Sequence, residues 1–226
     1  MSLKEIYDKQ GYIILKDIFS EEEINKAKEI ILEYKKNNKL LSNSSGYTIA
    51  NFIDIKDLEY ISTLKDNSRI HETLKVIFNG DNYRFCSHND IGINRIVGWH
   101  KDKLNGKYSK YETKDIWSIH NNEKHEIVKV LIYLENHDNT NDGLKLVPGS
   151  HLVRFIDSSK NIKIKSNIGD VIIFDQRITH RGNEKQVKDS RILVSFGFGK
   201  NNIFTDNFEK GTIARQNNQN NQNKKK

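Results

Sequence analysis

The stretch Ile127-Val-Lys-Val-Leu-Ile-Tyr-Leu134 decides the fold class, because it has the length and apolar content of a buried β-strand. Similar short apolar runs occur at residues 91–97, 144–147, 171–174 and 191–198. No long helical pattern separates these runs. The sequence therefore predicts a mainly β chain whose strands form a barrel or a jelly roll, with helices packed outside it.

Upstream of this strand-rich region, the sequence has helical patterns. Ser20-Glu-Glu-Glu23 matches a capping box, and the apolar residues behind it share one stripe, which predicts a helix over residues 21–36. A second helical pattern ends at Asn79-Gly80, where a glycine forms a left-handed C-terminal cap at little cost. Residues 12–15 are predicted to form a strand before the first helix.

Length and composition are those of one folded domain. A chain of 226 residues can bury a substantial core, and 35% hydrophobic with 30% charged residues is polar but still typical of a folded protein. We expect a single domain over residues 1–214, helical to about residue 82 and with its β core over about residues 83–200. Residues 215–226, rich in Asn and Gln and ending in three lysines, are predicted to be disordered and without a chemical role.

The charge and the cysteine content indicate which kinds of partner and which cellular compartment to expect. Four of the positive charges behind the net +7 lie in residues 215–226, which contain no acidic residue, so residues 1–214 carry +3. This balance argues against a nucleic-acid partner. Cys86 is the only cysteine, which excludes an intrachain disulfide and fits a reducing compartment. Without a signal-like or membrane-spanning apolar run, we expect a cytoplasmic protein with no membrane partner.

His-x-Asp is the pattern among the eight histidines that suits metal chemistry. The zinc-protease pattern fails, because neither His71-Glu72 nor His125-Glu126 has a second histidine four residues after the first. His-x-Asp occurs twice, as His88-Asn-Asp90 and His100-Lys-Asp102. Residues two apart on an extended chain point to the same side, so each copy can supply two metal ligands. The spacing alone does not choose between them.

The context of the second copy resembles the phytanoyl-CoA dioxygenase family over about residues 85–200. The motif series of this family is matched in order and spacing by Trp99-His-Lys-Asp102, Lys129-Val-Leu-Ile-Tyr-Leu-Glu135, Asn141-Asp-Gly-Leu-Lys-Leu-Val-Pro-Gly-Ser-His151, Gly169-Asp-Val-Ile-Ile-Phe-Asp175, Thr179-His180 and Arg191. Only the copy that follows Trp99 has the form of the family, so this copy is chosen over His88 and Asp90.

The resemblance implies a non-haem Fe(II)- and 2-oxoglutarate-dependent dioxygenase on a double-stranded β-helix, the cupin-like form of a jelly roll. Its iron ligands, which are also its catalytic residues, would be His100, Asp102 and His180. The expected cofactors are Fe(II), 2-oxoglutarate and O2. The expected reaction hydroxylates a small organic molecule and releases succinate and CO2.

Two other histidines receive structural interpretations. His88 is expected to be a partly exposed strand residue. His151 closes Val147-Pro-Gly-Ser-His151, which contains the only proline of the chain, and the fixed φ of Pro148 with the freedom of Gly149 suits a sharp turn between strands. In the family that the chain resembles, this position is structural.

Two basic residues are candidates for binding 2-oxoglutarate. Arg191 shares one strand face with Leu193 and Ser195, and if that face is interior, its guanidinium needs an anion such as the far carboxylate of 2-oxoglutarate. In the family, the co-substrate arginine lies eleven residues after the distal histidine, as Arg191 does here. The other interpretation is an exposed arginine at a hairpin end. Lys129 lies beside Leu131 on a very apolar strand, so its side chain faces either the same pocket or the solvent.

Two residues depart from the family pattern, and a second function stays open. Leu131 stands where the family can carry a tryptophan against the co-substrate, and Gly182 stands where a serine can donate to it. The alternative function is a non-catalytic metal- and carboxylate-binding cupin-type module. Retention of both Asp102 and Arg191 argues against that alternative. The substrate and the oligomeric state cannot be read from the sequence.

The polar segment of residues 103–126 is unusually long for a connection in a compact domain. It contains Tyr108, Tyr111 and Trp117 and starts directly after a predicted iron ligand. One interpretation is a surface excursion that its aromatic residues pin to the barrel. The other is a lid that closes over the bound substrate.

Overall fold

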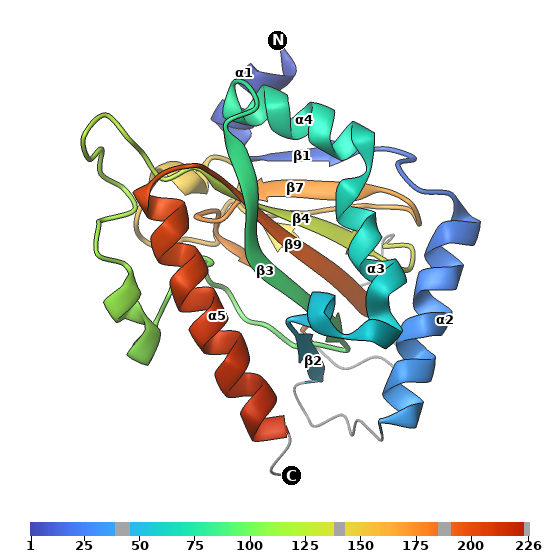
Figure 1. Ribbon diagram of the computed structural model, residues 1–226. Coiled ribbons are helices and arrows are strands. Elements are labelled where there is room, and N and C mark those ends of the chain that lie inside the picture. The colour runs from blue at the N-terminus through green and yellow to red at the C-terminus, as the bar shows by residue number, and fades with distance from the viewer. Residues whose placement is uncertain (39–45, 138–142, 185–190, 224–226) are drawn as a thin grey trace.

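Two antiparallel sheets form the centre of the computed structural model, which describes residues 1–38, 46–137, 143–184 and 191–223 (Figure 1). The larger sheet has the order β1 (Tyr12–Leu15), β7 (Val171–Asp175), β4 (Ile127–Tyr133), β9 (Ile192–Lys200), β3 (Tyr83–Ile93) and β2 (Tyr47–Ala50). The smaller sheet has the order β6 (Ile162–Lys163), β5 (Lys145–Leu146) and β8 (His180–Arg181). This antiparallel, crossed-over order fits the predicted jelly roll.

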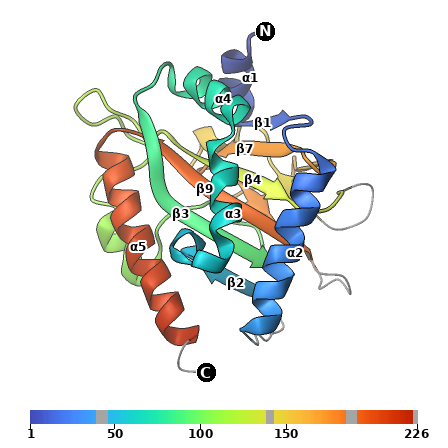
Figure 2. The same ribbon diagram turned by 45° about the vertical axis from the view of Figure 1, so that its right-hand side comes forward.

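The helices lie outside the strands, as predicted. They are α1 (Leu3–Gln10), α2 (Glu21–Asn37), α3 (Glu59–Thr63), α4 (Ser68–Phe78) and α5 (Ile203–Asn223), with short 3-10 helices at Phe52–Asp54, Lys56–Leu58, Leu64–Asp66, Gly106–Tyr111 and Ser150–Leu152. Helices α2, α3 and α4 cover one face of the larger sheet, and α5 packs along β3 (Figure 1 and Figure 2). No helix in the described part of the chain combines the length and apolarity needed to span a bilayer.

Strand β4 is buried on both faces, which explains its nearly continuous apolar sequence. Val130 and Ile132 belong to the core between the larger sheet and the helices. Leu131 and Tyr133 belong to a second core that also contains residues of the smaller sheet. Because side chains alternate along a strand, Lys129 lies on the same side as these two residues, facing away from the helices.

Most predicted elements are confirmed, with shifts at positions where asparagine ends an element. The predicted capping box begins α2, and β1 has the predicted bounds. The strand predicted over residues 91–97 is the end of a longer strand, β3, which stops before Asn94 because that residue is left-handed (φ 52°). Asn79 (φ 58°), rather than Gly80, is the left-handed cap of α4. Asparagine tolerates this conformation better than most residues with a side chain.

The turn predicted at the only proline is present. Gly149 follows Pro148 with a φ of 76°, which is the left-handed conformation that favours glycine. His151, directly after this turn, is 3% exposed, and its Nε2 lies 3.2 Å from the backbone oxygen of Asp8. A Cβ at Gly11 would collide with the His151 ring. The structural role expected for His151 fits this packing.

The prediction of disorder from residue 215 onward is wrong, because α5 continues through that position. Gln216 is 1% exposed, and its side-chain amide donates to Asp90 Oδ1 over 3.1 Å. Arg215 forms an ion pair of 3.0 Å with the other oxygen of Asp90. Polar partners on β3 thus order the segment. Its lack of apolar residues had suggested disorder instead. Residues 224–226 of the predicted tail and residues 141 and 142 of the family motif lie outside the described residues.

Candidate active site

A cavity of about 430 Å³ is lined by both sheets, by α5 and by residues 100–108. The larger sheet forms one wall with residues on its face opposite the helices, which include His88, Asp90, Lys129, Leu131, Leu193 and Ser195. Of the predicted site residues, four line the cavity: His100, Asp102, Lys129 and His180. Arg191 is not among the lining residues.

The three predicted iron ligands come together on this cavity. One ligand atom from each of His100, Asp102 and His180 lies within 4.8 Å of the others, and the described residues contain no other cluster of this kind. Nε2 of His100 is 3.3 Å from one oxygen of Asp102, and Nε2 of His180 is 3.7 Å from the other. The two imidazoles and the carboxylate therefore face one common point.

Backbone hydrogen bonds hold these residues in register. His100 and His180 exchange both backbone hydrogen bonds, each of 2.9 Å, as an antiparallel pair. The amide of Asp102 donates to the backbone oxygen of Gln176 over 3.0 Å. The intervening Lys101 donates its ammonium group elsewhere, to the backbone oxygens of Ser150 and Arg177. The extended geometry predicted for His-x-Asp is thus present, although no regular strand covers it.

The tautomers of both histidines suit metal binding. Nδ1 of His100 lies 2.8 Å from the backbone oxygen of Gly98, and Nδ1 of His180 lies 3.0 Å from that of Ile178. A carbonyl oxygen can only accept, so each Nδ1 carries the proton and each Nε2 keeps a lone pair. Two such nitrogens and one carboxylate oxygen on one side of a metal form the donor set typical of non-haem iron(II) oxygenases. The residues present therefore fit the expected metal.

The electrostatics of the site favour the charge states that Asp102 and His180 need as ligands, whereas, against the effect of burial, the hydrogen bond with Asp102 raises the pKa of His100. Burial alone would raise the pKa of Asp102, but Lys129 and His180 outweigh burial and hold this pKa well below its usual range. Burial lowers the pKa of His180 to about 4, against the opposing effect of Asp102. At neutral pH, Asp102 is therefore a carboxylate and His180 a neutral imidazole, as metal coordination requires.

The side chain of Lys129 faces the cavity, so the solvent-exposed interpretation is wrong. It is 7% exposed, and its ammonium nitrogen lies 3.5 Å from Asp102 Oδ2. The same nitrogen lies 2.7 Å from Nε2 of His88 and can donate to it. Lys129 thus connects the candidate metal ligand Asp102 to the other His-x-Asp copy.

Arg191 lies beside the cavity rather than on it. Its side chain is 12% exposed, which excludes the exposed hairpin-end interpretation. One guanidinium nitrogen donates to Asn183 Oδ1 over 2.6 Å, and Nε lies 3.7 Å from a carboxylate oxygen of Glu135. Burial raises the pKa of the cavity-lining Tyr133, and the positive charge of Arg191 opposes that rise. The anionic partner that a buried guanidinium needs is thus supplied in part by Glu135.

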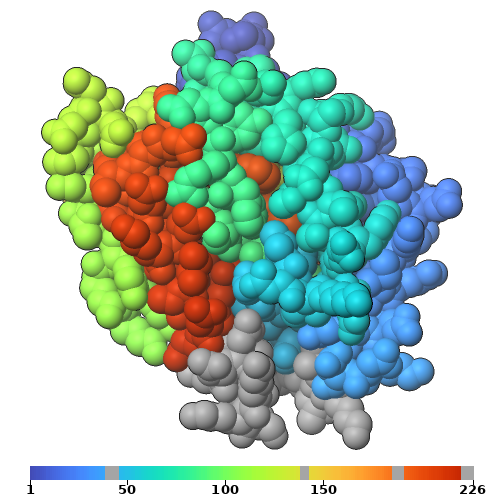
Figure 3. Space-filling view, viewed as in Figure 1, coloured from blue at the N-terminus to red at the C-terminus, as the bar shows by residue number. Residues whose placement is uncertain are grey.

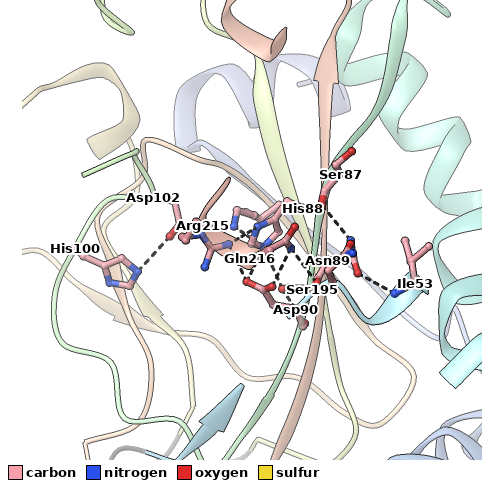
Figure 4. Close-up of polar contacts among 12 residues, drawn as sticks. Ile53, Ser87, His88, Asn89, Asp90, His100, Asp102, Ser195, Arg215 and Gln216 are labelled. Atoms are coloured by element: carbon pink, nitrogen blue, oxygen red, sulfur yellow. Dashed lines mark hydrogen bonds and ion pairs between the residues drawn. The ribbon is translucent and has the colours of Figure 1, made fainter. Parts of the chain in front are cut away.

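The unselected His-x-Asp copy is buried, which corrects the prediction of a partly exposed His88. His88 is 5% exposed, and Asp90 lies beside it on β3 (Figure 4). His88 lines the cavity on the same face of β3 as Asp90, next to an irregularity in the pairing of β3 with β9, where Ser87 is left-handed (φ 58°). Burial and the adjacent Lys129 lower the pKa of His88 to about 3, so its imidazole is neutral.

Helix α5 contributes cavity residues that the sequence analysis missed. They lie on one face of the helix: Phe208, Thr212, Arg215 and Gln219. Their spacing of four, three and four residues is a helical stripe, and this was the available signal. The assumption of disorder from residue 215 onward hid it.

The segment of residues 103–126 runs beside α5 at the surface (Figure 3). Leu104 and Tyr108 line the cavity, and Tyr111 packs with them against Phe208 of α5. Trp117 lies farther along, under the guanidinium of Arg154. The start of the segment thus forms part of the site, while its closure as a lid stays a prediction. The two departures from the family pattern, Leu131 and Gly182, both line the cavity.

Comparison with known families agrees with this geometry. Residues 7–193 match the model of the family described as phytanoyl-CoA dioxygenase (PhyH). The chain belongs to the phytanoyl-CoA dioxygenase family. The resemblance predicted from the motif series is thereby confirmed, and it extends further toward the N-terminus than those motifs. Among curated protein sequences, no match was found.

Solved structures with a similar fold include proteins that hold 2-oxoglutarate. HygX from Streptomyces hygroscopicus, with nickel and 2-oxoglutarate bound, has a TM-score of 0.68 at 14% identity, over 87% of this chain and 85% of its own. EctD from S. alaskensis, with 2-oxoglutarate and 5-hydroxyectoine, has a TM-score of 0.68 at 16% identity, over 87% and 74%. SnoN, a non-heme alpha ketoglutarate dependent epimerase from nogalamycin biosynthesis, has a TM-score of 0.62 at 12% identity, over 88% and 82%. At these identities the likeness establishes the double-stranded β-helix fold.

Proposed function

We propose that this chain is a non-haem Fe(II)- and 2-oxoglutarate-dependent dioxygenase that hydroxylates a small organic molecule and releases succinate and CO2. The observation that carries the proposal is the convergence of His100, Asp102 and His180, whose ligand atoms lie within 4.8 Å of one another. We assign these three residues as iron ligands. Membership of the phytanoyl-CoA dioxygenase family supports the same activity.

The solved relatives support the cofactors and the kind of substrate. HygX was solved with nickel and 2-oxoglutarate, and EctD with 2-oxoglutarate and 5-hydroxyectoine. We infer that this chain likewise takes Fe(II), 2-oxoglutarate and O2, together with a small-molecule substrate. SnoN is described as an epimerase, so the same fold also carries reactions with another outcome. Hydroxylation is favoured here because the small molecule in the EctD structure is a hydroxylated one.

The residues of this chain supply ligands, orientation and a shaped cavity. When bound, iron(II), 2-oxoglutarate and O2 supply the oxidation, in which 2-oxoglutarate loses CO2 to become succinate and one oxygen atom enters the substrate. His100 and His180 present Nε2 to the metal because backbone carbonyls hold their Nδ1–H groups. The ammonium group of Lys129 steadies the Asp102 carboxylate from 3.5 Å.

We propose that Arg191 binds the far carboxylate of 2-oxoglutarate, with Lys129 as the alternative anchor. Arg191 has the family spacing from His180, and its planar fork matches a carboxylate through two parallel hydrogen bonds. Its positive charge acts on Tyr133, which lines the cavity. Lys129 already lines the cavity, although it is held by Asp102 and His88.

We further infer that the chain acts as one domain and works in the cytoplasm. The N-terminal helices and the larger sheet share a single core, so neither part has a separate one. Cys86 is a buried free thiol, and burial raises its pKa to about 12, which suits a structural cysteine rather than a reactive one. A nucleic-acid partner is not part of the proposal.

The experiment that tests the function is an anaerobic titration of the full chain with Fe(II) and 2-oxoglutarate, followed by a metabolite screen for succinate release in O2. The proposal predicts that 2-oxoglutarate binds tightly only when metal is present, and that one class of metabolite raises succinate release. The matched control is Asp102→Asn, which removes an anionic ligand without changing shape. A chain that binds both ligands and never turns over would instead be the metal- and carboxylate-binding module.

A further inference from the structure

The part of the cavity next to α5 carries polar groups that the proposed iron chemistry does not use. We call this part the outer pocket and define it by five cavity-lining residues: Asp90, Arg95, Thr212, Arg215 and Gln219. Figure 4 shows Arg215, His88 and Asp90 gathered beside Asp102. A substrate that reaches the iron site along α5 would pass these groups.

The charges around the iron site balance once its ligands are present. Lys129 contributes one positive charge and Asp102 one negative charge. Bound iron(II) adds two positive charges, and 2-oxoglutarate adds two negative ones. Arg191 already has Glu135 nearby. Lys129, Asp102, the metal and the co-substrate therefore sum to no net charge, which makes the basic residues of the outer pocket the candidates for recognising a charged substrate.

In the outer pocket, Asp90 is satisfied while Arg95 is not. Asp90 pairs with Arg215 over 3.0 Å and with the amide of Gln216 over 3.1 Å. In contrast, no carboxylate in the described part of the chain forms an ion pair with Arg95. Its Cγ would lie 3.1 Å from a Cβ at Gly92, so the side chain runs over the inner face of β3. Desolvation and the nearby Arg215 lower the pKa of Arg95 despite the opposing Asp90, while the residue as a whole is exposed and therefore accessible to a ligand.

Two polar atoms on α5 also lack partners. Thr212 is 1% exposed, and its buried hydroxyl has no hydrogen-bond partner among the described residues. The side-chain oxygen of Gln219 is buried and equally without a partner there. Buried polar atoms are nearly always hydrogen-bonded in native proteins. Both residues line the cavity, so a ligand with hydrogen-bonding groups can satisfy them.

We propose that the substrate carries a carboxylate or a phosphate group, which Arg95 binds in the outer pocket, while polar groups of the substrate pair with Thr212 and Gln219. The proposal rests on the oxygenase function proposed above and specifies the class of its substrate. The guanidinium of Arg95 offers a planar fork of donors, which matches either anion through two hydrogen bonds. Arg95 is exposed, lines the cavity and is not held by a carboxylate of the described residues, so its guanidinium is accessible to such an anion. Arg95 is thus a specificity-determining residue.

The test is a calorimetric titration of the full chain with inorganic phosphate and, separately, with acetate. The metal-free protein is titrated first, so failure to bind iron or 2-oxoglutarate would not affect the result. The same titrations are then repeated on the chain loaded with nickel(II) and 2-oxoglutarate. The anion that binds more tightly distinguishes a phosphate-bearing from a carboxylate-bearing substrate.

Three variants make the titrations specific. Arg95→Gln should weaken anion binding about tenfold or more, as expected for loss of a charged hydrogen-bonding partner. Arg95→Lys, which keeps the charge but loses the fork, should give an intermediate affinity. Arg154→Gln is the matched control, because it removes the same charge from a side chain that is 65% exposed and outside the cavity. Its anion affinity should equal that of the wild type, and a thermal melt checks that each variant folds.

Two results would overturn the proposal. The first is a wild-type chain that binds neither phosphate nor acetate in either form. The second is an Arg95→Gln chain that binds the anion as tightly as the wild type, which would place the anion on the metal or on another basic residue. In both cases the metal and 2-oxoglutarate affinities, measured in the same samples, would still report independently on the oxygenase function.

Discussion

The two His-x-Asp copies line the same cavity, yet only one of them presents open donor atoms to it. In the copy at His100, Nδ1 is held by a backbone carbonyl and Nε2 faces the partner ligands. In the copy at His88, Nε2 accepts from the ammonium group of Lys129. The carboxylate of Asp90 is likewise taken by Arg215 and by a side-chain amide of α5.

The comparison shows that the residues around a His-x-Asp motif decide whether the motif can bind a metal. A cation already occupies the position near His88 that a metal would need, and a second metal ion there would meet the charges of Lys129 and Arg215. The copy at His100 has a third ligand across an antiparallel pair, His180, and among the described residues the copy at His88 has none. The same three-residue pattern thus serves as metal ligands in one place and as structural support in the other.

The largest expected effect separates the two copies by their iron affinity. His100→Ala removes a ligand atom, so iron(II) affinity should fall about 100-fold or more, beyond the range seen when residues that only orient a ligand are replaced. His88→Ala should leave nearly full iron stoichiometry. Metal analysis after anaerobic loading checks both variants. Loss of iron from the His88 variant with retention in the His100 variant would reverse the assignment.

The next effect concerns the co-substrate and compares Arg191 with Lys129. Arg191→Lys keeps the charge but loses the fork, so the free energy of 2-oxoglutarate binding should weaken by about 1–3 kcal/mol while iron affinity is retained. Equilibrium titration of the metal-loaded chain measures the change. Lys129→Met is the comparison. If the Lys129 variant loses 2-oxoglutarate and the Arg191 variant does not, Lys129 is the anchor.

A pH effect of similar size tests whether His88, unlike the proposed iron ligand His100, is a neutral structural residue. Its pKa is lowered to about 3 in the folded chain, below its ordinary value near 6.5. The stability from keeping it neutral is therefore fully present above pH 6.5 and is lost as the pH falls toward 3. Between pH 7 and pH 5, the free energy of unfolding should fall by about 2 kcal/mol more for the metal-free wild type than for His88→Gln. Urea denaturation at both pH values measures it, and equal losses would show that His88 is not buried in a neutral state.

The smallest expected effect tests whether α5 stabilises the His-x-Asp copy formed by His88 and Asp90. Arg215→Ala leaves the carboxylate of Asp90, whose side chain is 13% exposed, without its charged partner. We expect a loss of about 1–2 kcal/mol in the free energy of unfolding. Arg154→Ala breaks an exposed ion pair with Asp115 and should cost less than about 0.5 kcal/mol. Equal losses in the two variants would mean that α5 does not hold Asp90.

Those elements of the fold and the site that depend on local sequence patterns or on motif context could be predicted from the sequence. Alternation and short apolar runs predicted β4 and β7 because both strands are buried on two faces. The capping box predicted α2 because the hydrogen bonds it needs lie within four residues. His100, Asp102 and His180 were selected by motif context, and the backbone pairing that brings them together is antiparallel, as the β-rich pattern suggested.

The parts that could not be predicted depend on contacts between distant segments. The burial of His88 depends on side chains from distant segments, such as Lys129 and Arg215, which no local pattern shows. The order of α5 at residue 215 depends on polar partners 125 residues earlier in the chain, at Asp90. The position of Arg191 beside the cavity depends on Asn183 and Glu135, two polar residues that its own strand does not reveal.

The central claim is that iron binds to His100, Asp102 and His180 and not to the copy on β3. Anomalous diffraction at the iron edge, from crystals of the full chain grown anaerobically with Fe(II) and 2-oxoglutarate, locates the metal directly. If the assignment is right, one strong anomalous peak lies within bonding distance of Nε2 of His100, of the carboxylate of Asp102 and of Nε2 of His180. A peak between His88 and Asp90, or no peak within bonding distance of the three assigned ligands, would contradict it.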